Sequence, residues 1–169
     1  MTIDVHVADE QSDHPVDLER WSELTRSVFI AEGVTGDAEV SLLFVDEPTI
    51  ASLNERFLGK EGPTDVLSFP IEDEVPVSGR APDVGGTGPG SMEGTGEPVF
   101  LLGDLVICPA VAARHAVERH VVFDDEIALL IVHGALHLLG MDHEIDAEAE
   151  RMERRERELL ERFHRRRVG

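Results

Sequence analysis

Three histidines within eleven residues are the feature that most limits what this chain can fold into and do. They belong to the run HGALHLLGMDH at residues 133–143. Residues four apart on a helix lie about 40° apart around the axis and about 6 Å apart along it, so His133 and His137 can direct two imidazoles to one point. Gly140 can take the positive φ that ends a helix, and the turn can bring His143 back as a third ligand.

This spacing predicts a metal site with three imidazole ligands. Neutral imidazole is the commonest protein ligand for zinc, and three protein ligands with one open position describe a catalytic zinc site. A closed structural site would need a fourth ligand, and the only cysteine of the chain, Cys108, is not near the run. Core or surface histidines without a metal are the alternative, which the three-residue pattern disfavours. We therefore expect one Zn2+ per chain, bound by His133, His137 and His143.

The three histidines and the glycine have the spacing of the metzincin zinc proteases, HExxHxxGxxH. In those proteases the residue after the first histidine is a glutamate that acts as general base. Here that residue is Gly134, and a general base typically contributes about 10²–10⁴-fold to the rate. The run therefore predicts a zincin-like metal-site helix, but it disfavours a peptidase.

The same run resembles the YbeY family of bacterial endoribonucleases, because it fits the motif HGxLHLxGxDH at every fixed position. Two further segments resemble that family, PTDVLSFP at residues 63–70 and LGDLVI at residues 102–107. One position departs from the pattern, since many members have an arginine where this chain has Leu58. Arg56 and Lys60 flank that position, and we expect one of them, with Lys60 favoured, to contact phosphate instead.

The resemblance implies a single-strand-directed, zinc-dependent endoribonuclease that acts in 16S ribosomal RNA 3′-end maturation and in ribosome quality control. It also implies a cytoplasmic protein whose partners are ribosomal RNA and the small ribosomal subunit. A ribosomal protein or an assembly GTPase is a further candidate partner, which could supply a basic surface.

The mechanism that follows from such a site has open points. Zinc would lower the pKa of bound water and polarise a phosphoryl oxygen, and either a metal-bound hydroxide or the RNA 2′-hydroxyl could attack. Asp142, beside the third ligand, is a candidate for orienting an imidazole, although a role in the turn fits equally well. Asp65 and Asp104 lie near strand ends and could face the cleft, although ordinary turn or strand hydrogen bonds are the favoured interpretation for both. No residue is assigned as general base.

Two other functions fit part of the pattern, a zinc peptidase-like hydrolase and a zinc-stabilised ribosome-assembly factor without nuclease activity. The charge of the chain keeps the second alternative open. The sequence has 15 basic and 35 acidic residues, a net charge of −20. Such a chain repels nucleic acid unless basic charge is focused locally.

The hydrophobic patterns predict an α+β fold, with a mixed β-sheet packed with helices, in a single domain over residues 1–169. Alternating segments predict strands at 3–8, 37–46, 64–70 and 99–108. Helical spacing predicts helices at 16–32, at 46–58 with Asp46 as its cap, and at 109–120. A further helix, capped by Asp124, is predicted to carry His133 and His137, and a last helix is predicted from Asp146 to about Arg167.

Two segments have an unusual composition. Residues 72–98 are rich in glycine and proline, which predicts a flexible surface loop. Residues 150–157 are dense in glutamate and arginine, which we interpret as a solvated helix face. The sequence has no apolar run of 18 residues and no basic-then-apolar start, so we expect neither a membrane span nor a secretory signal.

Overall fold

The structure is a computed structural model, and it describes residues 2–71, 99–141 and 146–165 of the chain. Three parts of the sequence prediction lie outside these residues: the loop at 72–98, Asp142 and His143. Within the described ranges, no helix is both long enough and apolar enough to span a membrane.

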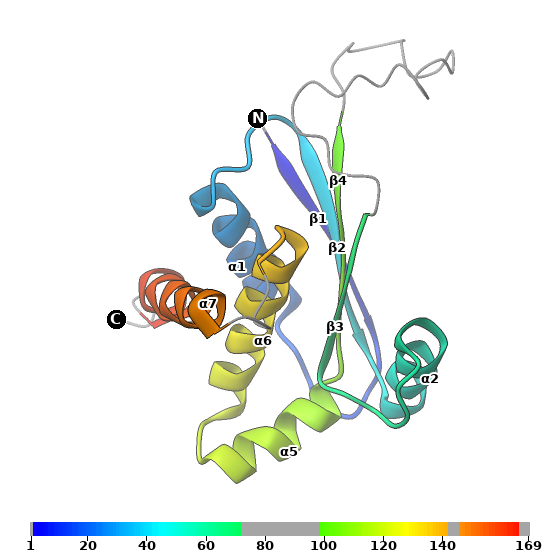
Figure 1. Cartoon of the computed structure of the whole chain (residues 1–169). Coiled ribbons are helices and arrows are strands. Elements are labelled where there is room, and N and C mark those ends of the chain that lie inside the picture. The colour runs from blue at the N-terminus through cyan, green and yellow to red at the C-terminus, as the bar shows by residue number, and fades with distance from the viewer. Residues whose placement is uncertain (1, 72–98, 142–145, 166–169) are drawn as a thin grey trace, which may run out of the picture.

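Four strands form one mixed sheet in the order β1-β2-β4-β3 (Figure 1). The first three in this order are parallel, and β3 pairs antiparallel with β4 at the edge. Their bounds are Ile3–Glu10 (β1), Ala38–Val45 (β2), Val66–Pro70 (β3) and Phe100–Ile107 (β4). The predicted mixed sheet and α+β class are confirmed, with strand bounds that differ from the predicted ones by a few residues.

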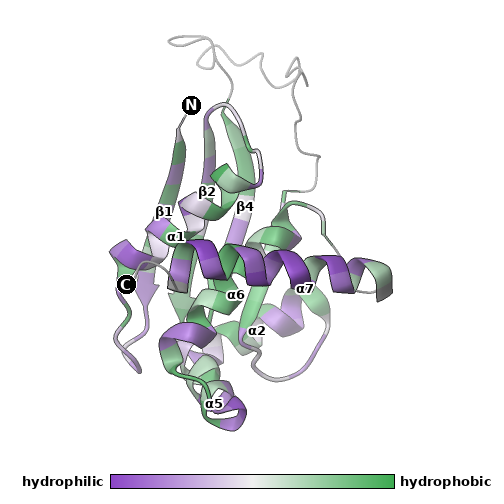
Figure 2. Cartoon of the chain, turned by 90° about the vertical axis from the view of Figure 1, so that its left-hand side faces the viewer, coloured by the Kyte–Doolittle hydropathy of each residue, from purple (hydrophilic) through white to green (hydrophobic). Residues whose placement is uncertain are grey.

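Helices cover the two faces of the sheet unequally (Figure 1). The face that carries the larger core is covered by α1 (Leu18–Ala31), α6 (Phe123–Leu138) and α7 (Asp146–Leu160), and α7 continues as a π-helical turn, Glu161–Arg165. The opposite face carries α2 (Glu47–Leu58), and α5 (Pro109–Arg119) links β4 to α6. Figure 2 shows α7, with its many hydrophilic residues, crossing over the largely hydrophobic α6.

Strand β4 separates two hydrophobic clusters because successive side chains point to opposite faces of a sheet. Leu105 and Ile107 pack in the larger cluster with α1, α6 and α7. Val106, together with Cys108 directly after the strand, packs in the smaller cluster with Ile50 of α2. Helices α6 and α2 therefore lie on opposite faces of the sheet.

The helix starts agree with the predicted caps in one case and not in another. The Asp46 carboxylate accepts a hydrogen bond from the Thr49 amide at 3.0 Å, as expected of the cap of α2. Asp124 does not cap α6, so that prediction is wrong: Val122 precedes the helix in an extended conformation and Phe123 is already helical. Asp124 lies in the first turn instead, where a negative charge is favoured by the helix dipole, and pairs with Arg20 at 2.9 Å.

Helix α6 packs closely against the sheet at Gly134. A Cβ atom at this position would lie 2.7 Å from Leu105 Cδ2 and 3.1 Å from Ser68 Oγ. The Ser68 hydroxyl also donates a hydrogen bond to the Gly134 carbonyl oxygen at 3.3 Å. The residue that replaces the peptidase glutamate is therefore one whose position leaves no room for a side chain.

We expect Gly134→Ala to lower the free energy of unfolding by about 1–2 kcal/mol. Alanine would gain up to about 1 kcal/mol in helix propensity, but the added methyl group overpacks a buried contact, which typically costs about 1–3 kcal/mol. Urea denaturation measures the difference. In the Leu105→Val background, where the crowding methyl group is removed, the same substitution should cost less, and a gain in stability of the single variant would contradict the packing account.

Candidate metal centre

His133 and His137 lie one turn apart on α6 and face the same way. Their ring centroids are 4.7 Å apart and the ring planes are inclined by 75°. Both side chains are partly exposed, whereas the other residues from Ile131 to Leu138 are buried. The predicted pair is therefore brought together on the partly exposed side of α6, where His133 lines a cavity together with Val66 of β3.

The chain turns sharply after this pair. Helix α6 ends at Leu138, and Gly140 has a φ of 98°, in the left-handed region that favours glycine. The Gly140 amide donates to the His137 carbonyl at 2.9 Å, and the Met141 amide donates to the Leu136 carbonyl at 3.1 Å. The predicted glycine turn is confirmed, and the approach of His143 after it stays a prediction.

Glu156 of α7 holds the first histidine. Its carboxylate lies 2.5 Å from Nδ1 of His133, and the residue is only 8% exposed. An ionised carboxylate can only accept, so the Nδ1–H of His133 donates, and Nε2 is the nitrogen that would bind a cation. A ligating histidine typically has such a partner on its other nitrogen.

The interpretation of this helix as a solvated charged face is wrong for Glu156. Residue 156 lies on the inward stripe of α7, with Met152 one turn before it and Leu159 and Leu160 after it. A carboxylate at an inward position of an amphipathic helix was the signal available in the sequence, but it does not identify the partner.

A cavity of about 250 Å³ adjoins His133 and Glu156. Three other residues that line it come from separate segments: Asp65 precedes β3, His115 is on α5, and Glu126 is on α6. Their ligand atoms all lie within 4.8 Å of one another. This His/Asp/Glu group could hold a metal ion, and the sequence analysis did not find it.

Two hydrogen-bonded pairs organise the group. Nδ1 of His115 lies 3.1 Å from an Asp65 carboxylate oxygen, so Asp65 has a specific side-chain partner rather than only the turn contacts that we expected. Arg119 donates to both carboxylate oxygens of Glu126, at 2.9 and 3.1 Å. Burial raises the pKa of Glu126, and the guanidinium of Arg119 opposes that shift.

The residues expected to contact phosphate lie elsewhere. Arg56 is on α2 and Lys60 follows it, both are exposed, and the Arg56 guanidinium lies 5.4 Å from the ring centroid of Phe57. Since α2 packs on the face of the sheet opposite α6, the structure does not group them with the histidine pair (Figure 1). Asp104 is exposed on β4, whose next residue, Leu105, points to the α6 side. Phosphate contact by Arg56 or Lys60 stays a prediction.

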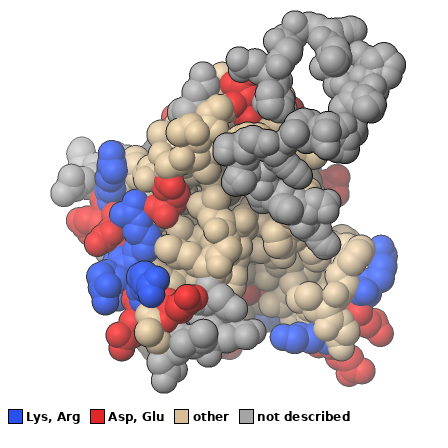
Figure 3. Space-filling model, turned by 45° about the horizontal axis from the view of Figure 1, so that its top comes forward, with Lys and Arg blue, Asp and Glu red and all other residues tan. Residues whose placement is uncertain are grey.

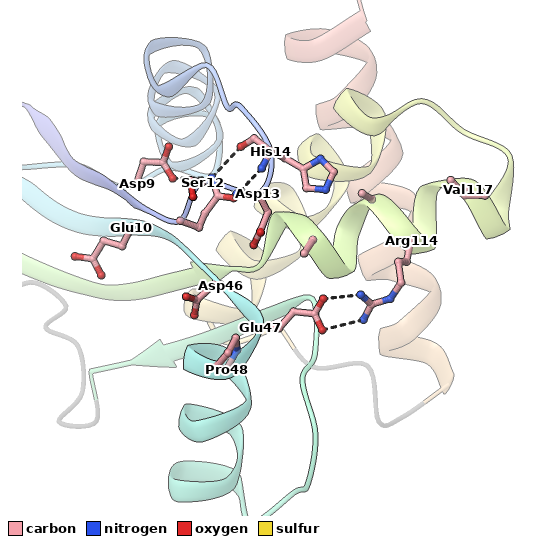
Figure 4. Close-up of a pocket in the computed structure, with 13 residues that line it drawn as sticks. Asp9, Glu10, Ser12, Asp13, His14, Asp46, Glu47, Pro48, Arg114 and Val117 are labelled. Atoms are coloured by element: carbon pink, nitrogen blue, oxygen red, sulfur yellow. Dashed lines mark hydrogen bonds and ion pairs between the residues drawn. The ribbon is translucent and has the colours of Figure 1, made fainter.

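A larger cavity, of about 1100 Å³, lies at the carboxyl ends of β1 and β2 (Figure 4). Its charged lining is mainly acidic, with Glu10 and Asp46 among the carboxylates. Arg114 donates to Glu47 at 2.6 Å and holds the pKa of that carboxyl below its usual value. This cavity includes neither histidine of the pair, and its charge disfavours an anionic ligand.

Arginine side chains gather on the outer side of α7 (Figure 3). Among the described residues, these exposed arginines alternate with four exposed glutamates, Glu150, Glu153, Glu158 and Glu161. Arg151 lines a hollow of about 220 Å³ with Leu139, Gly140 and Met141, at the turn that follows the histidine helix. The exposed members among the described residues, which we call the α7 arginine face, are Arg151, Arg154, Arg157 and Arg162.

The buried carboxylate of the His/Asp/Glu group predicts a specific pH dependence. Because burial raises the folded-state pKa of Glu126, the folded protein binds more protons than the unfolded chain in the window above the ordinary glutamate value of 4.5. The free energy of unfolding therefore falls as pH rises through that window. Glu126→Gln cannot ionise, so its stability relative to the wild type should increase with pH over the same range.

Urea denaturation at a series of pH values measures this difference. Glu118→Gln removes one negative charge from an exposed position of α5 and controls for net charge. A relative stability of Glu126→Gln that decreases with rising pH would contradict the assignment.

Comparisons with known proteins identify the family. The model of the family described as Endoribonuclease YbeY matches residues 6–164. The endoribonuclease YbeY of Moorella thermoacetica is 41% identical, over 91% of this chain and 93% of that protein. That of Thermobifida fusca is 42% identical, over 95% and 92%. The solution structure of TM1509 from Thermotoga maritima has a TM-score of 0.54 and 26% identity, and the match covers 92% of this chain and 89% of that one. The chain therefore belongs to the YbeY family of endoribonucleases.

Proposed function

We propose that the chain is a single YbeY-like domain, residues 1–169, that cleaves single-stranded RNA with a zinc ion bound by His133, His137 and His143. The observation that carries the proposal is the first two imidazoles, held on one side of α6 with Nδ1 of His133 on the Glu156 carboxylate. This arrangement supports a cation site, because a ligating histidine typically has such a partner on its other nitrogen and both imidazoles are partly exposed.

The chain's own residues would perform distinct tasks in the reaction. A bound zinc ion supplies Lewis-acid chemistry, which polarises a phosphoryl oxygen and activates water. Glu156 keeps the proton of His133 on Nδ1 and fixes the orientation of the ring. Asp142 is a candidate for a similar role at another imidazole, and Lys60 or Arg56 for a phosphate contact.

The packing of Gly134 supports a nuclease over a peptidase. A peptidase of the metzincin type needs a glutamate at that position as general base, and a Cβ atom there would already lie 2.7 Å from Leu105.

The charge distribution supports RNA binding despite the net charge of −20. Affinity for nucleic acid comes largely from lysine and arginine near phosphates, so local density matters more than the sum. The α7 arginine face lies on the helix that supplies Glu156, whereas the acidic cavity lies at the carboxyl ends of β1 and β2. We infer that RNA approaches the histidine site from the α7 side.

The specific substrate, the cellular role, the location and the partners are also proposals. By membership of the family we infer a substrate at the 3′ end of 16S ribosomal RNA, a role in ribosome quality control, and a cytoplasmic location. The small ribosomal subunit is the inferred partner, with a ribosomal protein or an assembly GTPase as a further candidate.

Cleavage of a labelled single-stranded RNA that spans the 16S 3′ end tests the proposed activity. Zinc-loaded protein should cleave it, and His137→Ala should be slower by at least about 100-fold, because metal catalysis contributes several kcal/mol. A duplex of the same sequence and casein are the control substrates. The proposal fails if casein is cleaved and RNA is not. It also fails if His137→Ala supports normal 16S maturation and ribosome binding in cells, which would favour the assembly factor.

Substitution of the residue that holds His133 should weaken metal binding. We expect Glu156→Gln to reduce zinc affinity by about 10–100-fold, the usual effect of removing the partner of a ligating histidine. Competition with a chromophoric chelator measures the affinity. Glu153→Gln, an exposed position on the same helix, is the matched control, and equal affinities of the two variants would show that Glu156 does not act through His133.

A further inference from the structure

Beside the histidine pair, the structure brings together a second set of metal-ligand atoms. Asp65, His115 and Glu126 come from three segments, and their ligand atoms lie within 4.8 Å of one another. None of the three belongs to the HGALHLLGMDH run. We propose that these residues form a second site, for a divalent cation, that fills independently of the zinc site.

The separation of the ligand atoms suits an ion with small adjustments. Opposite ligands of an octahedral ion with bonds of about 2.1 Å lie about 4.2 Å apart, and no pair of these ligand atoms is more than 4.8 Å apart. His115 and Asp65 are partly exposed, with 40% and 23% of their side chains accessible, and can move. The adjoining cavity of about 250 Å³ has room for an ion and its water ligands.

The donor set indicates the class of ion. Two carboxylates and one imidazole combine the oxygen ligands that suit Mn2+ with a nitrogen ligand that transition metals accept. Mg2+ and Ca2+ prefer oxygen alone. The site should therefore take Mn2+, or another first-row divalent ion, in preference to Mg2+ and Ca2+.

The charges around Glu126 show how the site is kept stable without an ion. Glu126 is 2% exposed, and a buried carboxylate is costly unless it is paired. Arg119 provides the pair by donating to both carboxylate oxygens, and its own side chain is half exposed. Arg119 can therefore swing into solvent when an ion takes its place, and it acts as a competitor for the carboxylate.

The location gives the second ion a role that rests on the proposed function. The same cavity is lined by His133 and Glu156, so an ion here adds positive charge next to the zinc site. In a chain with a net charge of −20, that charge lowers the repulsion of a phosphodiester at the point of cleavage. Binding of the ion itself does not depend on this role.

Titration with Mn2+, followed by the electron paramagnetic resonance signal of the free ion, tests the site. Protein loaded with one equivalent of zinc should bind one Mn2+ per chain. Asp65→Asn and Glu126→Gln should each weaken this binding by at least about tenfold, and Glu118→Gln should not. Arg119→Gln should strengthen it by about tenfold, because a competing charge is removed; an ion pair that only stabilises the fold gives no such gain. Urea denaturation checks that each variant is folded. If Glu126→Gln does not fold, Asp65→Asn alone still tests the site.

The inference is overturned if the zinc-loaded protein binds no Mn2+ at millimolar concentration, or if Asp65→Asn and Glu126→Gln bind it as the wild type does. Failure of the proposed function has a different signature. His137→Ala should lose zinc and still bind Mn2+, and a protein that binds Mn2+ but cleaves no RNA would refute the nuclease while the second site stands.

Discussion

The contact between α6 and the sheet at Gly134 is the constraint on which the rest of the site depends. Leu105 and Ser68 lie so close that only a residue without a side chain fits. Close to this contact, His133 and His137 are partly exposed, while their neighbours fill the core. This packing contact explains why no glutamate side chain fits at the position of the peptidase general base, directly after the first imidazole.

Helix α7 adds a carboxylate partner to the histidine pair of α6. It crosses α6 with Met152, Leu159 and Leu160 turned inward, which places Glu156 on His133, while its outer side presents arginines (Figure 3). The opposite charge gathers at the carboxyl ends of β1 and β2 (Figure 4). In this strongly acidic chain, exposed arginines therefore lie on the same helix as the carboxylate that contacts His133.

Much of this fold could be predicted from local sequence patterns, whereas the rest depends on tertiary contacts. Strand alternation, helical spacing and the glycine turn at Gly140 follow from neighbouring residues, so the sequence predicted the elements, the mixed sheet and the histidine pair. The role of Glu156 and the grouping of Asp65, His115 and Glu126 depend on which segments meet in space. The residue pattern within one segment does not predict such contacts. Asp124 was assigned as a cap from its residue type, but the helix begins one residue earlier at Phe123.

The central claim is that α6, fixed on the sheet at Gly134, presents imidazoles to one cation and leaves a coordination position open. X-ray absorption at the zinc edge of the zinc-loaded protein tests it most directly. The account predicts three imidazole nitrogens at about 2.0–2.1 Å and one further oxygen ligand. A site with a sulfur ligand, with four protein ligands, or with fewer than two imidazoles would contradict it.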